Sequence, residues 1–117
     1  IRDRFYVMNT LRNSAEQSRL DLDCMKRNAS DAVNLLKVLA NEPRLMIMCI
    51  LSEGEVSVGQ LNQRIKLSQS ALSQHLAVLR EQGLVQTRRE SQTIYYSLAD
   101  TAAMNIVELL HDTYCEV

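Results

Sequence analysis

Side chains able to read DNA bases gather on one face of a helix predicted over residues 68–82. They stand mostly near its N-terminal end, where a recognition helix presents short polar groups to base edges in the major groove. A glutamine can bond adenine at two points, and a serine hydroxyl can donate or accept. These candidate DNA contacts are Ser68, Gln69, Ser70, Ser73, Gln74 and His75. The same stripe would also fit the solvated face of an ordinary amphipathic helix.

Three arginines are candidate contacts for the phosphate backbone. Arg80 lies on the same helix, and Arg88 and Arg89 stand beside the tip of a predicted hairpin. An arginine at such a tip suits a phosphate or the minor groove, and it also suits a solubilising charge on a turn. Residues 60–96 carry five Lys or Arg against two Asp or Glu, so this stretch is positive in a chain of net charge −1. Local charge of this kind favours a nucleic-acid surface.

The three cysteines are the remaining reactive side chains, and none forms a CxxC pair. Cys49 lies in an apolar segment, which is typical of a buried and inert thiol. Cys115 has acidic neighbours, which should raise rather than lower its pKa. Metal, redox and plain core roles therefore stay open for the cysteines, Cys24 included. The histidines His75 and His111 are isolated, so we expect no metal and no cofactor.

Helices are predicted around these residues. Apolar side chains recur at steps of three and four from Leu20 to Leu39, which indicates one long helix or two short ones with a break near residues 28–30. Asn41 and Pro43 are typical of a new helix start. The following run, residues 45–51, is apolar on all sides, so we expect it to form the central, buried helix.

The next segment predicts a helix-turn-helix followed by a hairpin. Ser57 caps a short helix, the turn at residues 67–68 leads into the polar-faced helix, and two alternating runs flank a turn at residues 90–92. A last helix begins near Thr101 and carries an apolar stripe that ends at Tyr114. The fold class expected is mainly α with a small β-hairpin, a winged helix-turn-helix.

The 117 residues are expected to form one domain, the winged helix-turn-helix DNA-binding domain at 20–117, with an N-terminal extension at 1–19. No apolar run reaches the length of a membrane span and no signal-peptide pattern is visible, so we expect a cytoplasmic protein without a membrane partner. No Ser/His/Asp arrangement, Gly-rich phosphate loop or pair of catalytic carboxylates stands out, so we do not expect an enzyme.

Two stretches resemble the ArsR/SmtB family of dimeric winged-helix transcriptional regulators. They are LLKVLANEPRLMIMCIL and SVGQLNQRIKLSQSALSQHLAVLREQGLVQTRRESQTIYYSL, and the resemblance covers about Leu20 to Cys115. It implies a homodimer with the N- and C-terminal helices at the interface. It also implies that the homodimer binds double-stranded DNA at a near-palindromic operator.

The chain departs from the metal-sensing members of that family. Ser57 stands where a metal-site cysteine would be. Asp100 and Glu116 match the C-terminal metal site, but Ala102 and Thr113 replace its histidines. Two carboxylates without imidazole make a poor zinc site.

The chain instead resembles the thiol-based branch of the family, with Cys49 and Cys115 at the two sensing positions (MCIL and DTYC). The resemblance implies that these cysteines come close in one protomer and can form a disulfide or polysulfide bridge. Cys24 matches no sensing position. We therefore expect a DNA-binding regulator whose operator affinity responds to oxidation or persulfidation of the pair. The alternatives are a metal-responsive ArsR/SmtB-type repressor and a winged-helix regulator with no sensing function.

Overall fold

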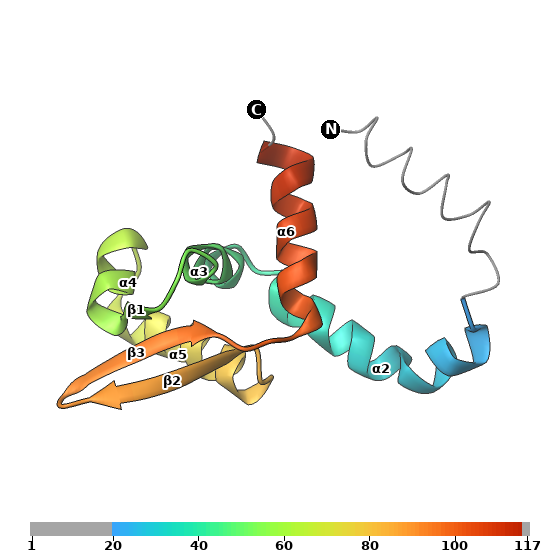
Figure 1. Ribbon diagram of the computed structural model, residues 1–117, viewed down its shortest axis with the longest axis horizontal. Helices are drawn as coiled ribbons and strands as arrows, with labels where there is room; N and C mark the ends of the chain where they lie inside the picture. The colour runs from blue at the N-terminus through green and yellow to red at the C-terminus, as the bar shows by residue number, and fades with distance from the viewer. Residues whose placement is uncertain (1–19, 116–117) are drawn as a thin grey trace.

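The computed structural model describes residues 20–115, so the predicted N-terminal extension at 1–19 and Glu116 lie outside the described residues (Figure 1). Its elements follow the order α2 (Leu22–Leu39), α3 (Glu42–Leu51), β1 (Val56–Ser57), α4 (Val58–Arg64), α5 (Gln69–Glu81), β2 (Val85–Glu90), β3 (Thr93–Leu98) and α6 (Ala102–Cys115). The predicted winged helix-turn-helix is confirmed: α4 and α5 form the helix pair, and β2 and β3 form the wing.

α2 is one continuous helix, without the break considered near residues 28–30. The Asp21 side chain caps its start by accepting a hydrogen bond from the backbone N–H of Cys24 at 3.1 Å. The helix reaches away from the other described elements in Figure 1, and its buried side chains are Val38 and Leu39, in the last turn.

α3 is the central helix and packs against α2, α5, α6 and β3. It begins as predicted: the Asn41 side chain accepts from the backbone N–H of Arg44 at 3.1 Å, and a proline occupies the first turn. Ile47 is fully buried. Its neighbour Met46 remains 52% exposed, so the expectation of a helix buried on all sides is wrong along this edge. Within residues 20–115, the side chain of Met46 therefore stays half open to solvent.

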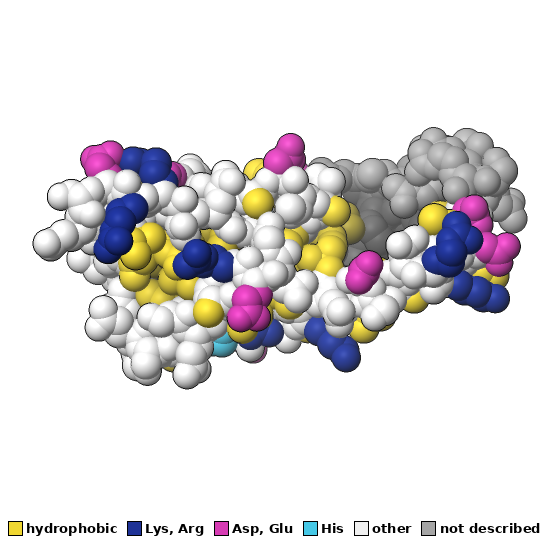
Figure 2. Space-filling model, turned by 90° about the horizontal axis from the view of Figure 1, so that it is seen from below, with side chains coloured by type: hydrophobic (Ala, Val, Ile, Leu, Met, Phe, Trp, Pro, Cys, Tyr) yellow, Lys and Arg dark blue, Asp and Glu magenta, His cyan; other side chains and the backbone are white. Residues whose placement is uncertain are grey.

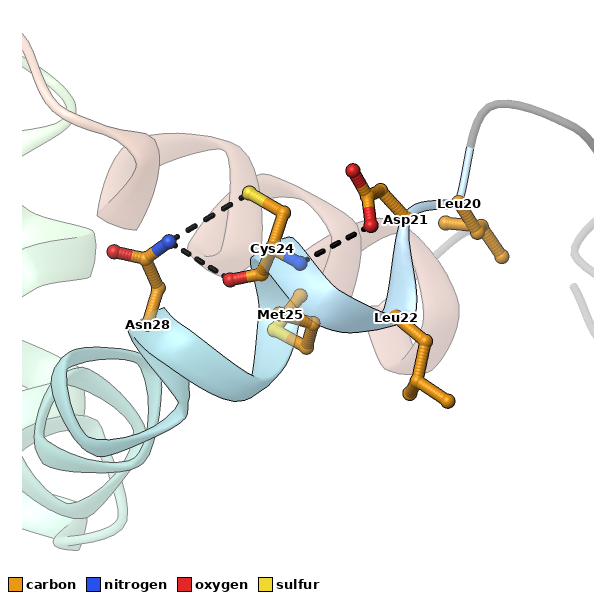
Figure 3. Close-up of a pocket in the computed structure, with 6 residues that line it drawn as sticks. All are labelled: Leu20, Asp21, Leu22, Cys24, Met25 and Asn28. Carbon is orange, nitrogen blue, oxygen red and sulfur yellow. Dashed lines mark hydrogen bonds between the residues drawn. The ribbon is translucent and has the colours of Figure 1, made fainter.

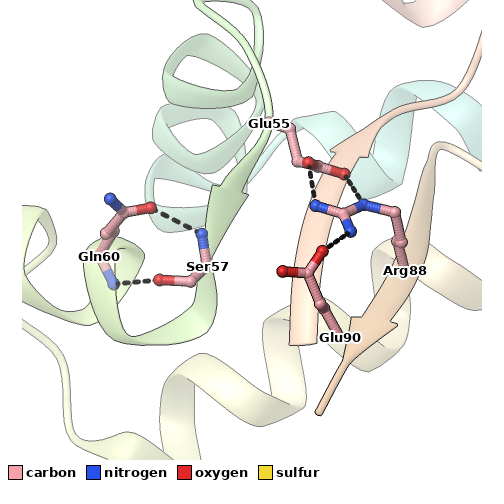
Figure 4. Close-up of polar contacts among 5 residues, drawn as sticks. All are labelled: Glu55, Ser57, Gln60, Arg88 and Glu90. Carbon is pink, nitrogen blue, oxygen red and sulfur yellow. Dashed lines mark hydrogen bonds and ion pairs between the residues drawn. The ribbon is translucent and has the colours of Figure 1, made fainter. Parts of the chain in front are cut away.

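The two helices of the helix-turn-helix begin at serine caps. Ser57 and Gln60 form a capping box before α4, in which each side chain accepts from the backbone N–H of the other (Figure 4). Ser68 caps α5 by accepting from the backbone N–H of Ala71 at 3.1 Å. The inward face of α5 consists of Leu72, Leu76 and Leu79, all of them buried.

The wing belongs to a three-stranded antiparallel sheet of order β1-β3-β2. Ser91 adopts a positive φ of 60° in the turn between β2 and β3. The third strand, β1, was not predicted, because two residues are too few to produce an alternating pattern. In the register, Ser57 on β1 and Arg88 on β2 both pair with Tyr95 on the middle strand.

α6 packs on α3 and stands upright beside it in Figure 1. Ala103 and Val107 are buried in this contact, whereas Leu109 is 44% and Tyr114 is 77% exposed. The predicted apolar stripe of this helix is therefore covered near its start and open to solvent at its end. None of the helices between residues 20 and 115 combines the length and apolar character needed to cross a membrane.

Candidate DNA-binding surface and thiol cleft

Most of the predicted base-reading residues share the outward face of α5. Ser68 at the cap and the helix residues Gln69, Ser70, Ser73 and Gln74 are exposed. The buried leucines occupy the other side, so the core holds the helix while its polar face stays free for a partner. Arg80, on the same outward face, is exposed as well.

His75 differs from the other candidates because it is only partly exposed and lies on the far flank of the leucine stripe. Its Nδ1 lies 3.4 Å from a guanidinium nitrogen of Arg44 at the start of α3. Because a guanidinium can only donate, this contact requires Nδ1 to accept and Nε2 to carry the ring proton. Arg44 also donates to the carbonyl oxygen of Val38 at 2.7 Å. His75 therefore contacts the junction of α2 and α3.

The side chain of Arg88 is held by two carboxylates (Figure 4). Its Nε and one terminal nitrogen donate to the two oxygens of Glu55 at 3.1 and 2.8 Å, and the other terminal nitrogen donates to Glu90 at 2.8 Å. The guanidinium carbon lies 4.5 Å from the centre of the Tyr95 ring, at cation–π distance. The hydrogen bonds from Arg88 hold the pKa of Glu55 below its usual range.

Arg89 lies on the opposite face of the wing. It pairs in the register with Ile94, which lines a groove of about 400 Å³ between the wing tip and the starts of α4 and α5. Gln69 lines the same groove. No carboxylate between residues 20 and 115 forms an ion pair with Arg80 or Arg89. Figure 2, a view from below that of Figure 1, shows Lys and Arg side chains scattered among hydrophobic, acidic and other side chains.

A second candidate site is a cleft between α3 and α6. It measures about 320 Å³ and is lined by Cys49, Ser52, Glu53, Leu98, Met104, Val107, Glu108 and His111. Cys115 lies one helical turn beyond His111 on α6. Burial raises the pKa of the Cys49 thiol, and the nearby Cys115 and Glu53 raise it further. Both cysteines are free thiols.

Cys24 lies apart from this cleft, in the first turn of α2. The amide of Asn28 donates to the carbonyl oxygen of Cys24 at 2.9 Å and approaches its sulfur at 3.6 Å (Figure 3). Across residues 20–115, the structure brings no three His, Cys, Asp or Glu side chains together in an arrangement that could hold a metal ion.

Residues 41–87 match the family model described as "Bacterial regulatory protein, arsR family". The transcriptional activator HlyU of Vibrio cholerae is 54% identical over 97 residues, which are 83% of this chain and 90% of that protein. The biofilm growth-associated repressor of Xylella fastidiosa is 40% identical over 109 residues, 93% of this chain and 95% of that protein. The chain belongs to the ArsR family.

Solved structures of ArsR-type regulators share the fold. Reduced HlyU from Vibrio cholerae aligns with a TM-score of 0.76 at 55% identity, covering 81% of this chain and all of that one. The transcriptional repressor BigR from Xylella fastidiosa aligns with a TM-score of 0.76 at 43% identity, covering 84% of this chain and all of that one. The chain is thus a transcriptional regulator with a helix-turn-helix, and its relatives are regulators rather than enzymes.

Several residues of both sites were missed from the sequence. The carboxylates Glu53 and Glu108 beside Cys49 carried no motif that could have placed them there. Glu55 and Arg44 were missed for a similar reason. Each lies more than thirty positions along the sequence from its partner, Arg88 and His75 respectively. Only the position of His75 could have been found from the sequence. The helical spacing of the buried leucines places it away from the outward face of α5.

Replacing Glu53 by Gln should lower the pKa of Cys49, because a nearby negative charge makes the thiolate harder to form. Since the thiolate is the reactive form, iodoacetamide should alkylate Cys49 faster in the variant at neutral pH. The rise of the rate with pH should also begin at a lower pH. Mass spectrometry of the labelled peptide at a series of pH values measures this.

Glu42→Gln, at the opposite end of α3, is the matched control and should keep the wild-type pH profile. A profile for Cys49 that is the same in Glu53→Gln and the wild type would contradict the electrostatic account of this cleft.

Proposed function

We propose that the chain is a cytoplasmic, homodimeric DNA-binding regulator whose operator affinity falls when Cys49 and Cys115 become linked. The observation that carries the sensing part is the position of Cys49 in the α3–α6 cleft, one wall of which belongs to the helix that ends in Cys115. The relative from Vibrio cholerae is described as reduced HlyU, which supports a role for oxidation state in this group of proteins.

The DNA contacts we propose follow the outward face of α5 and the inner face of the wing. Near the start of α5, polar side chains would read bases, and Arg80 and Arg89 would bind phosphates. The base-reading set is Ser68, Gln69, Ser70, Ser73 and Gln74. Two observations support this division: neither arginine forms an ion pair within residues 20–115, and Gln69 lines the same groove as the wing tip.

Homodimerisation is supported by an uncovered apolar stripe on α2. Leu22, Met25, Val33 and Leu36 recur at helical spacing on one side, and each is 45–68% exposed. An apolar face of this extent is typical of an interface. A second copy of the chain fits it, because a twofold dimer would also present two α5 helices to paired half-sites of DNA about 34–36 Å apart.

The thiol chemistry we propose is a two-electron oxidation. Hydrogen peroxide would accept two electrons from the two thiols, its oxygens would leave as water, and a sulfur–sulfur bond would form between Cys49 and Cys115. A persulfide R–SSH would instead pass its outer sulfur to one thiol and leave as R–SH. Attack of the other cysteine on the inner sulfur would then close the disulfide and release hydrogen sulfide. The bridge formed by either route would tie α3 to α6 and change how far apart the two α5 helices are held.

Replacing Gln74 by Ala or Arg89 by Met should weaken binding to a duplex selected by the wild-type protein from a random pool. Loss of a base contact costs about 1–3 kcal/mol, roughly 5- to 150-fold in affinity, and should relax the preference at one base position. Loss of a phosphate contact should instead lower the slope of log K against log salt by about one. Fluorescence anisotropy at several salt concentrations measures both.

Arg27→Met on α2, which also removes one positive charge, is the control and should keep the wild-type salt slope. If Gln74→Ala and Arg89→Met bind the selected duplex as tightly as the wild type, the proposed surface is not the DNA contact.

Hydrogen peroxide should lower the affinity of the wild-type protein for that duplex by roughly tenfold or more, because a population shift of this size needs only about 1.4 kcal/mol of coupling. Cys49→Ser and Cys115→Ser should each abolish the response, since one thiol cannot close the bridge. Intact-protein and peptide mass spectrometry should find the 49–115 link with two hydrogens lost.

Cys24→Ser is the matched control and should respond to peroxide as the wild type does. Full oxidation of Cys49 and Cys115 with unchanged affinity for the duplex would remove the sensing proposal and leave the DNA-binding one standing.

Replacing Leu36 by Glu should dissociate the dimer. An unpaired charge buried in an interface costs about 3–5 kcal/mol, so self-association should weaken by roughly a hundredfold or more. Sedimentation equilibrium should find twice the chain mass for the wild type and the single-chain mass for the variant. Asn34→Glu, on the exposed opposite side of α2, should stay dimeric, and a dimeric Leu36→Glu would exclude this interface.

A further inference from the structure

Arg88 reaches across the whole wing sheet. It stands on the edge strand β2, passes over the ring of its register partner Tyr95 on β3, and ends on Glu55, which directly precedes β1. Glu55 and Ser57 are two positions apart, so they share the face that carries Arg88 and Tyr95. The guanidinium thus links the two edge strands of the sheet, β2 directly and β1 through Glu55, across the face of the central strand β3.

The two neighbouring arginines of the wing serve opposite faces. Arg89 shares its face with the buried Val85 and with Ile94, which lines the groove, whereas Arg88 is on the other side. A DNA backbone lying along the groove between the wing and α5 would meet Arg89 first. Position alone therefore separates the roles of two adjacent residues of identical type.

The charges around Arg88 also disfavour a phosphate contact. Glu55 and Glu90 together carry two negative charges against its single positive charge, and they occupy three of its nitrogens at 2.8–3.1 Å. To bind a phosphate, the guanidinium would first have to leave a two-point carboxylate pair and a cation–π contact. The cluster as a whole would repel the anion.

We infer that Arg88 is a positioning residue that fixes the wing to the start of α4 through Glu55, and that it does not contact DNA itself. Ser57 ends β1 and at the same time caps α4, so a wing held at Glu55 is held next to the helix-turn-helix. This contact would set how the wing tip, which carries Ile94, lies relative to Gln69 in the groove. The inference rests on the DNA binding proposed above and assigns a different function to one residue of that region.

The test compares Glu55→Gln, Arg88→Met and Arg88→Lys on the duplex selected by the wild-type protein. Glu55→Gln removes a negative charge, so a purely electrostatic effect on DNA would be tighter binding. A positioning role predicts the opposite: Glu55→Gln and Arg88→Met should each raise the dissociation constant roughly three- to tenfold. Both should keep the wild-type salt slope, because no phosphate contact is lost.

Arg88→Lys separates the two roles further. Lysine keeps the charge that a phosphate needs and loses the fork that binds both oxygens of Glu55. A positioning role predicts that Arg88→Lys binds the duplex as weakly as Arg88→Met. Combining Glu55→Gln with Arg88→Met should add little to either change alone, since both remove the same contact. The exchanged pair Glu55→Arg/Arg88→Glu should recover part of the affinity.

Hydrogen exchange of the free protein gives a readout that does not depend on DNA. Backbone amides of β2 and β3 should exchange faster in Glu55→Gln and Arg88→Met than in the wild type, because the wing opens more often. Arg89→Met, the neighbouring control, should leave their exchange unchanged and lower the salt slope instead.

Binding of Glu55→Gln that equals or exceeds that of the wild type would overturn the inference, as would a salt slope lowered by about one in Arg88→Met. A selection that enriches no duplex at all would instead be a failure of the proposed DNA binding, and the hydrogen-exchange comparison would still decide whether Arg88 holds the wing.

Discussion

Burial of α3 is the constraint on which the rest of this protein depends. A single ten-residue helix packs against α2, α5, α6 and β3, so the two outer helices, the second helix of the helix-turn-helix and the wing all share one neighbour. Interiors are densely packed and transmit displacement rather than absorbing it. A change in the position of α3 must therefore alter several elements at once.

Polar contacts at the two ends of α3 also join this helix to its neighbours. At its start, Arg44 donates to a carbonyl at the end of α2 and meets His75 on the flank of α5. After its end, Glu53 pairs with Arg64 of α4 at 2.9 Å, and two positions later the next carboxylate holds the wing. Cys49 lies between these two ends. The thiol thus belongs to the helix that packs against both α5 and β3.

The features that were predictable from the sequence are local ones. The caps at Asn41, Ser57 and Ser68 depend on residues three positions away, and the buried and polar faces of α5 follow from helical spacing alone. The wing contact could not be predicted, because it joins residues 33 positions apart through a strand too short to detect. The contact between His75 and Arg44 spans 31 positions, and it could not be predicted because no local pattern connects the two residues. For Cys49 and Cys115, only the family resemblance indicated proximity.

The projecting first half of α2 has a consequence for how this regulator depends on its own abundance. Residues 21–31 are exposed throughout, and so short a helical segment is marginal in water without packing. If a second copy covers its apolar stripe, ordering of this segment and association become one event. The concentration of dimer able to bind DNA would then rise more steeply than the total concentration of the protein. Transcription of its own gene would set the threshold at which operators fill, alongside any signal carried by the thiols.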